Sequence, residues 1–284
     1  ERGEAGIFYT PRVEIDLMCR LALVNWLTNL LGAELKPLLY EAIFAFDPEE
    51  KTHADTALAE RNLWPQLNNL LRNVTALDPA CGSGSFLVGM LYVLDDLLAR
   101  AAVQLGIEET PYERKKRIIG QSLYGVDVMD WAVHVAELRL WLQLVIDTDL
   151  EPAELQFRPL LPNLSFKVRQ GDSLVQEIGS INLALRRGSR LIPPAIKGRI
   201  TQLKGEKLKF YQNDPQRKYQ TAQQLHLEEL RLFRDLLEER TQALDTRRRE
   251  LEQALAPQEN LFGEVQARQL GLDRMALEEE LTTL

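Results

Sequence analysis

Residues 77–86 read Leu77-Asp78-Pro79-Ala80-Cys81-Gly82-Ser83-Gly84-Ser85-Phe86, and the rest of the chain is organised around this stretch. A short apolar run over residues 74–77 precedes the two glycines, and an apolar run at helical spacing, residues 86–98, follows them. This order predicts a strand, a tight glycine loop and a helix, the opening unit of a nucleotide-binding α/β domain. Glycine lets the backbone approach a ligand closely, and the first N–H groups of the helix favour an anionic group. A generic strand-to-helix turn is the alternative interpretation.

The glycine loop lacks the fingerprints of several other sites. It contains neither G-x-G-x-x-G nor G-x-x-x-x-G-K-[ST], which argues against a dinucleotide and a triphosphate. Ser83 and Ser85 flank Gly84 in the wrong order for the G-x-S-x-G elbow of hydrolases. Asp78, at the expected strand end, would repel a pyrophosphate. A carboxylate there favours a ligand that carries an ammonium group.

Two further carboxylates are expected at strand ends. Residues 122–127 are predicted to form a second parallel strand, and an acidic residue at the end of that strand commonly binds ribose hydroxyls. Residues 164–170 alternate as a third strand and lead into Gly171-Asp172-Ser173-Leu174, where a carboxylate can accept a hydrogen bond from an adenine amino group. Asp78, Asp127 and Asp172 would then line one edge of the sheet. A helix cap at Asp127 and a plain turn at Asp172 are the alternatives.

Composition places the 284-residue chain among soluble globular proteins, with 45% hydrophobic and 27% charged residues. The sequence has no run of eighteen apolar residues, so we expect no membrane span. Its first residues, 1–4, do not resemble a signal peptide. Two cysteines, Cys19 and Cys81, fit a reducing cytoplasm without a disulfide framework. The three histidines are scattered and predict no metal site.

Helices are expected before the first predicted strand and between the predicted strands. Thr10 and Pro11 suit the cap and first position of a helix that continues to Leu31. Short helical pieces follow over residues 33–72, and we interpret them as packing. The helix after the glycine loop is predicted to end at about Leu105. Another helix is predicted to begin at a capping box at Thr110, and a third to span residues 129–146.

A basic segment separates the expected sheet from a helical arm. Residues 181–220 carry ten Lys and Arg against two Asp and Glu, within a chain of net charge −8. A helix is predicted to open at Pro193-Pro194 and to run to about Tyr211, and a longer one from Asp214-Pro215 to about Ala256. The basic residues are either a solvated face or contacts to a polyanion such as DNA. The candidate phosphate contacts are Arg186, Arg187, Arg190, Lys197, Arg199, Lys204, Lys207 and Lys209.

Four ordered motifs resemble those of amino-group DNA methyltransferases in their γ arrangement. The stretch 78–86 resembles their S-adenosylmethionine loop, and Phe8-Tyr9-Thr10-Pro11 resembles the element that closes over the methionine end. Residues 125–128 and 171–174 resemble the second and third motifs. The resemblance implies an N6-adenine DNA methyltransferase, as in large type IIG-like restriction–modification enzymes, with S-adenosylmethionine as cofactor and DNA as partner. It assigns cofactor binding to Tyr9, Thr10, Asp78, Ala80, Cys81, Gly82, Gly84, Phe86, Asp127, Val128, Asp172 and Ser173.

The catalytic (Asn/Asp)-Pro-Pro-(Tyr/Phe) string of those enzymes is absent. Residues 191–195 and 213–216 contain prolines but not the required neighbours. We therefore expect the cofactor-binding part of a longer enzyme, inactive by itself and without catalytic residues. Cytosine-C5 enzymes use a Pro-Cys nucleophile, but Ala80 precedes Cys81 here, so we interpret this cysteine as a small hydrophobic residue in a tight turn.

The expected fold is a partial Rossmann-like α/β methyltransferase sheet. We expect an N-terminal helical segment over residues 1–72, the cofactor-binding core over residues 73–180, and a long-helix arm over residues 181–284. Two other functions stay open: a methyltransferase that acts on RNA, protein or a small molecule, and a non-catalytic scaffold whose arm is an interaction surface.

Overall fold

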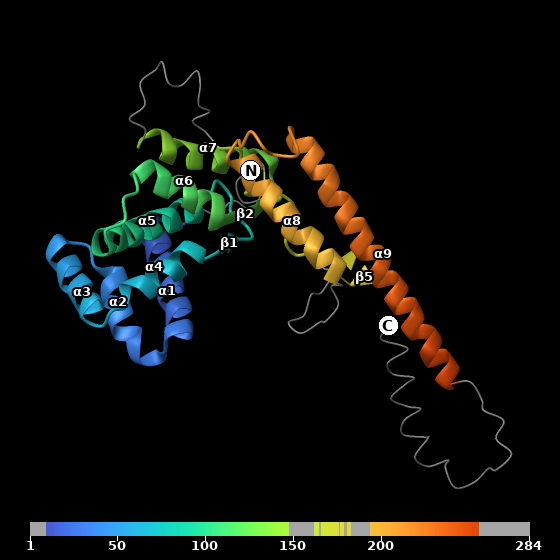
Figure 1. Ribbon diagram of the computed structural model, residues 1–284, viewed down its shortest axis with the longest axis horizontal. Helices are drawn as coiled ribbons and strands as arrows, with labels where there is room; N and C mark the ends of the chain where they lie inside the picture. Colours follow the sequence, from blue (N-terminus) through green and yellow to red (C-terminus); the bar gives the residue numbers. More distant parts are fainter. Residues whose placement is uncertain are drawn as a thin grey trace, which may run out of the picture. The chain divides into compact units, whose positions relative to one another are not determined.

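The computed structural model describes residues 10–147, 162–164, 166–175, 177–178, 181–182 and 194–255 (Figure 1). The chain divides into two compact units. The first unit comprises Glu1–Val175 together with Glu206–Lys218, and the second comprises Gln176–Gly205 together with Tyr219–Leu284. The division at residues 72 and 180 that the sequence suggests stays a prediction.

Short helices build the N-terminal part of the first unit, as expected. Proline lies in the first turn of three of them, where its missing N–H costs no hydrogen bond. The Asp47 side chain caps the third helix by accepting a hydrogen bond from the Glu50 N–H, 2.9 Å away. The elements are α1 (Arg12–Leu31), η1 (Ala33–Leu35), α2 (Lys36–Phe44), α3 (Pro48–Glu60) and α4 (Trp64–Asn73).

The predicted cap of α1 is wrong. The helix begins at Arg12, and its N-cap is Pro11 rather than Thr10. Pro11 has φ −59° and ψ 150°, an extended conformation, so it cannot serve as the first helical residue. No side chain caps this end.

The sheet of the first unit has three parallel strands in the order β1-β2-β3: β1 (Ala76–Asp78), β2 (Leu123–Asp127) and β3 (Val168–Gln170). In the register, Asp78 lies beside Gly125, and Asp127 lies beside Gln170. Parallel strands need crossovers, which helices provide here. The helices are α5 (Ser85–Leu105), α6 (Pro111–Gln121) and α7 (Asp130–Val145), and α6 begins with the predicted capping box.

Strand β3 is shorter than the sequence suggests. Residues 166–167 form a turn, in which the Lys167 N–H donates to the Leu164 carbonyl at 2.8 Å. The alternation of Phe166 and Val168 therefore does not reflect a continuous strand. In the described part of this segment, the pairing with β2 covers Val168–Gln170.

Helix α5 is the centre of the hydrophobic core. It contacts α1, α4, α6 and α7 as well as β1 and β2, and Figure 1 shows it among the helices of this unit. Leu91, Leu94 and Leu98 are at most 1% exposed. A Cβ added at Gly125 of β2 would lie 2.9 Å from Leu87 Cδ1, so the strand packs directly on the first turns of α5. Burial of these side chains is the main stabilising contribution to the unit.

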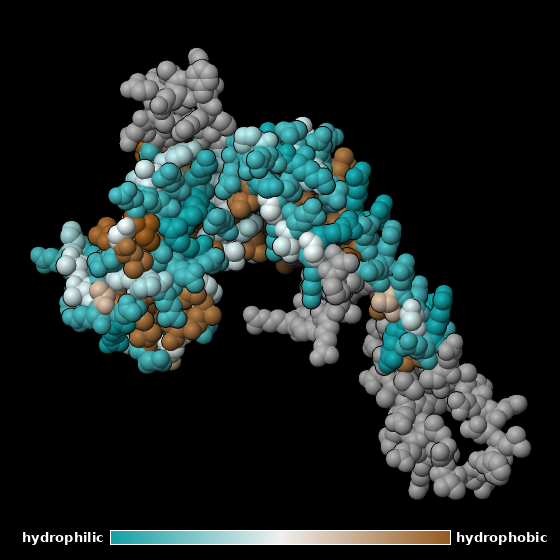
Figure 2. Space-filling model, viewed as in Figure 1, coloured by the Kyte–Doolittle hydropathy of each residue, from teal (hydrophilic) through white to brown (hydrophobic). Residues whose placement is uncertain are grey.

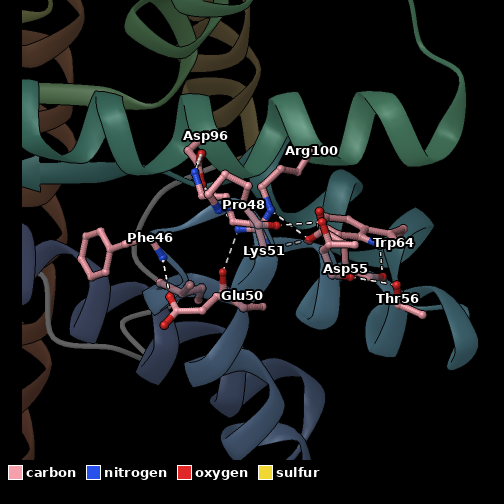
Figure 3. A network of polar contacts seen from close by, with 12 residues as sticks. Phe46, Pro48, Glu50, Lys51, Asp55, Thr56, Trp64, Asp96 and Arg100 are labelled. Carbon is pink, nitrogen blue, oxygen red and sulfur yellow. Dashed lines mark hydrogen bonds and ion pairs between the residues drawn. The ribbon is translucent and has the colours of Figure 1, made fainter.

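A buried polar network joins the N-terminal helices to α5 (Figure 3). The Arg100 guanidinium donates from Nε to Asp55 Oδ1 at 2.9 Å and from Nη1 to the Ala42 carbonyl at 2.8 Å. Lys51 of α3 reaches Asp96 of α5 at 2.6 Å. Trp64 donates from its indole nitrogen to the Asp55 carbonyl at 3.1 Å. One arginine of α5 thus fixes α2 and α3 in place.

The second unit contains a short antiparallel pair, β4 (Glu177–Ile178) with β5 (Ile181–Asn182). It also contains α9 (Ala222–Leu255) and most of α8 (Pro194–Tyr211), whose last residues belong to the first unit. An ion pair of 2.7 Å between Arg199 and Asp235 joins α8 to α9.

The long helix begins later than the sequence suggests. Residues 214–217 form a turn, because Asp214 accepts hydrogen bonds from the N–H groups of Gln216 and Arg217. Helix α9 begins at Ala222, after Thr221 accepts from the Gln224 N–H at 3.3 Å. In the described part of the chain, no helix combines the length and apolarity needed to cross a membrane.

Candidate functional site

The glycine loop between β1 and α5 has a tightly turned backbone. Gly82 and Gly84 have φ values of +52° and +78°, in the left-handed region that favours glycine. The Gly84 N–H donates to the Cys81 carbonyl at 2.8 Å, which closes the turn. A Cβ added at Gly84 would lie 2.9 Å from the Cβ of Ala136, whereas one at Gly82 would meet nothing within 4 Å. The loop is therefore packed against α7 at Gly84 and open at Gly82.

The carboxylate at the end of β2 binds this loop directly. Asp127 Oδ2 accepts a hydrogen bond from the Gly82 N–H at 2.8 Å, and Oδ1 accepts one from the Met129 N–H at 2.9 Å. The Cys81 N–H also donates to the Val126 carbonyl at 2.9 Å. Asp127 therefore lies where the sequence placed it, at the edge of the sheet beside the loop.

The end of β3 and the segment after it contact the glycine loop and the residue that follows β2. The Ser173 hydroxyl donates to the Pro79 carbonyl, and Gln170 Nε2 donates to the Val128 carbonyl at 3.1 Å. Asp172 is exposed, and its Oδ1 accepts from the Leu174 N–H at 2.9 Å. Hydrogen bonds of Ser173 and Gln170 thus join the end of β3 to the segments that follow β1 and β2, whereas the hydrogen bond of Asp172 is local.

Asp78 has one carboxylate oxygen that the described residues leave without a partner. Oδ1 accepts from the Ala80 N–H at 3.1 Å, but Oδ2 is buried and has no hydrogen-bond partner within the described ranges. Burial raises the pKa of Asp78, and the charge of Asp127 raises it further, while the Ala80 N–H lowers it. A buried, unpartnered carboxylate oxygen is costly, and a cationic ligand group would satisfy it.

Cys81 is buried inside the loop as a neutral thiol. Burial raises its pKa to about 12, and the charges of Asp78 and Asp127 act in the same direction. A thiol with this pKa is not a nucleophile at neutral pH. A Cβ added at Gly125 would lie 3.0 Å from the Cys81 sulfur, so the side chain fills the space between the loop and β2.

An open apolar pocket of about 300 Å³ lies beside Asp78. Helix α1 forms one wall, where Cys19 Sγ lies 3.7 Å from the Phe86 carbonyl. Leu77 of β1 is 64% exposed although it belongs to a strand. Figure 2 shows other hydrophobic residues gathered over the N-terminal helices. The pocket is lined by Met18, Cys19, Ala22, Ala76, Leu77, Asp78, Pro79, Phe86, Leu87 and Met90.

The predicted N-terminal site residues are Tyr9 and Thr10. Tyr9 lies outside the described residues, and Thr10 immediately precedes α1. Among the described residues, no hydrogen bond connects Thr10 to the glycine loop. Within the described residues, α1 contributes to the site through Met18 and Cys19, which line the pocket beside Asp78.

The basic segment is only partly described. Arg186, Arg187 and Arg190 lie outside the described residues. Arg199 pairs with Asp235, and Lys209 pairs with Glu206 at 2.9 Å, so carboxylates of the chain already partner these two cations. Lys197 and Lys204 are exposed on α8.

One residue that contacts the glycine loop gave no signal in the sequence. Arg139 of α7 donates from Nη1 to the Ser83 carbonyl at 3.1 Å and to the Ser85 hydroxyl at 2.8 Å. It is more than fifty positions from the loop along the chain and belongs to no motif. Only the packing of α7 against the loop reveals it.

The fold and the site can be compared with one class of protein. A glycine loop and carboxylates at the ends of parallel strands, with helical crossovers, are consistent with an α/β methyltransferase-like fold. In agreement, the family model described as the DNA-methyltransferase domain of MmeI matches residues 53–181. The matched range contains β1, β2, β3 and all three carboxylates.

A protein of Methanocaldococcus jannaschii is 33% identical to the chain over 178 residues. Its provisional name is type II restriction enzyme and methyltransferase RM.MjaORFECS2P. The match covers 62% of this chain but only 15% of that protein. No solved structure matches the chain. These similarities support a methyltransferase of a restriction–modification system.

Proposed function

We propose that the chain is the S-adenosylmethionine-binding part of a DNA methyltransferase that modifies the N6 amino group of adenine in a restriction–modification system. The observation that carries the proposal is the hydrogen bond between Asp127 and the Gly82 N–H. It joins the end of the second strand to the glycine loop and forms one edge at which a nucleoside can bind. The MmeI family match and the relative support the DNA substrate.

The side chains present fit the cofactor. The unpartnered oxygen of Asp78 suits the cationic methionine end. We assign to Asp127 the acceptance of hydrogen bonds from the ribose hydroxyls, and to the exposed Asp172 the acceptance of one from the adenine amino group. Val128, 57% exposed beside them, offers an apolar contact to the base. When bound, S-adenosylmethionine supplies an electrophilic methyl group.

Transfer to an adenine amine also requires that the amine be held in line with the methyl group. Enzymes that modify a base in duplex DNA extrude it and stack it on aromatic or apolar side chains. The sequence contains no (Asn/Asp)-Pro-Pro-(Tyr/Phe) string for this task. We assign the chain cofactor binding and leave base positioning to other parts of the full-length protein. Lys197 and Lys204 are the described, exposed candidates for DNA phosphate contacts.

Replacement of Asp127 or Asp172 by alanine tests the assignment. Loss of a charge-assisted hydrogen bond costs about 1.5–3 kcal/mol, so each variant should bind S-adenosylmethionine roughly ten- to a hundredfold more weakly in calorimetry. The matched control is Asp130→Ala, which removes a carboxylate three positions after Asp127 whose side chain is 66% exposed. Its affinity should equal that of the parent chain. Unchanged affinity in both site variants would contradict the assignment.

A further inference from the structure

Arg139 contacts the glycine loop at three acceptor atoms. Its Nη1 donates to the Ser83 carbonyl at 3.1 Å, to the Ser83 hydroxyl at 3.0 Å and to the Ser85 hydroxyl at 2.8 Å. Among the described residues, it has no carboxylate partner. The guanidinium therefore binds the loop rather than forming an ion pair at the surface.

Helix α7 presents two residues of one face to this loop. Ala136 and Arg139 are three positions apart on the helix, and such residues are neighbours on its surface. Ala136 is fully buried and leaves no room for a side chain at Gly84. The packing of Ala136 sets how closely the loop approaches α7, and the arginine then fixes the residues on both sides of Gly84.

The same segment of chain holds the loop from its other end. Asp127 and Val126, at the end of β2, bind the N–H groups of Gly82 and Cys81. Arg139 follows on the helix that begins directly after this strand. Each half of the loop is thus fixed by the β2–α7 segment, which also carries the proposed ribose-binding carboxylate.

A plain stabilising role for α5 does not explain this arginine. The N-terminus of a helix is the positive end of its dipole, where anions are favoured and cations are disfavoured. Ser85 is the first residue of α5, so Arg139 places a cation at that end. Its hydrogen bonds constrain the loop conformation, and its charge adds to the positive potential there.

We propose that Arg139 is a positioning residue for the cofactor, which holds the glycine loop in its binding conformation from the side of α7. The proposal rests on the proposed function, because it assumes that the loop binds S-adenosylmethionine. A preformed loop avoids an ordering cost on binding. Loss of Arg139 should therefore weaken cofactor binding without any lost contact to the cofactor itself.

The experiment measures S-adenosylmethionine affinity by calorimetry and thermal unfolding in parallel, on the 284-residue chain. Arg139→Met should bind at least tenfold more weakly, and Arg139→Lys, which keeps the charge and one donor, should recover part of the loss. The matched control is Arg72→Met, since Arg72 is also partly buried and binds Glu109 and Asn68 rather than the loop. It should lower the unfolding temperature without changing the affinity.

A second pair of variants removes the acceptor instead of the donor. Ser85→Ala should weaken S-adenosylmethionine binding. In a chain that already carries Arg139→Met, Ser85→Ala should weaken binding less than it does in the parent chain, because the two residues share one hydrogen bond. Unchanged affinity in both Arg139 variants, with a parent chain that binds, would overturn the positioning role alone. Absence of binding by the parent chain would overturn the proposed function and this inference together.

Discussion

Replacing Arg100 by methionine is expected to lower the free energy of unfolding of the chain by about 3–5 kcal/mol. Arg100 is 9% exposed and contacts Asp55, Asp96 and the Ala42 carbonyl. Methionine fills similar space but leaves the Asp55 carboxylate buried without its cation, which is the costly half of a broken ion pair. Urea denaturation followed by circular dichroism measures the change.

Two further variants separate charge from packing in this network. Arg100→Met combined with Asp55→Leu should recover much of the lost stability, because an apolar pair can replace a buried ion pair at little cost. Arg248→Met is the exposed control, since the ion pairs of Arg248 with Asp245 and Glu252 lie on the surface of α9. It should leave stability nearly unchanged. A small effect of Arg100→Met alone would contradict the role given to the network.

Substitution of Gly84 by alanine is expected to have the second large effect. A left-handed φ costs a residue with a side chain about 1–2 kcal/mol, and the overpacked contact with Ala136 adds about 1–3 kcal/mol. The loop relieves this strain by moving away from α7. S-adenosylmethionine affinity should therefore fall at least tenfold, as measured by calorimetry.

Gly106→Ala is the matched control at the other end of α5. Gly106 also has a left-handed φ, +65°, but an added Cβ would meet nothing within 4 Å. This variant should lose roughly 1 kcal/mol of stability through backbone strain and keep the affinity of the parent. Equal losses of affinity in the two variants would show that strain anywhere in α5 matters, rather than the conformation of the loop.

The local elements of the first unit were predictable because their signals lie within a few residues of one another. The two glycines, the apolar run of α5 and the capping box at Thr110 each specify a structure that neighbouring residues satisfy. The carboxylates at strand ends were predictable for a similar reason, since parallel strands place their carboxyl ends at the same edge.

The structure differs from the predictions where a competing local turn or a contact between residues distant in sequence decides the conformation. Phe166 and Val168 alternate like strand residues, but in the described part of this segment the pairing with β2 covers Val168–Gln170. Asp214-Pro215 has the composition of a helix start, yet the Asp214 side chain and carbonyl stabilise a turn. The contact of Arg139 with the loop could not be predicted from residue spacing, because it depends on how α7 packs against a loop far away in sequence. The burial of Asp78 Oδ2, which is unpartnered among the described residues, likewise cannot be predicted from residue spacing.

We propose that the loop and the three carboxylates bind S-adenosylmethionine rather than a phosphate-bearing nucleotide. Calorimetric titration of the 284-residue chain with S-adenosylmethionine, with S-adenosylhomocysteine and with ATP tests it most directly. The two adenosyl compounds should bind at one shared site and compete with each other, because both carry the ammonium group that Asp78 favours. ATP should neither bind there nor compete, because Asp78 and Asp127 repel its phosphates. Binding of ATP in place of the adenosyl compounds would contradict the claim.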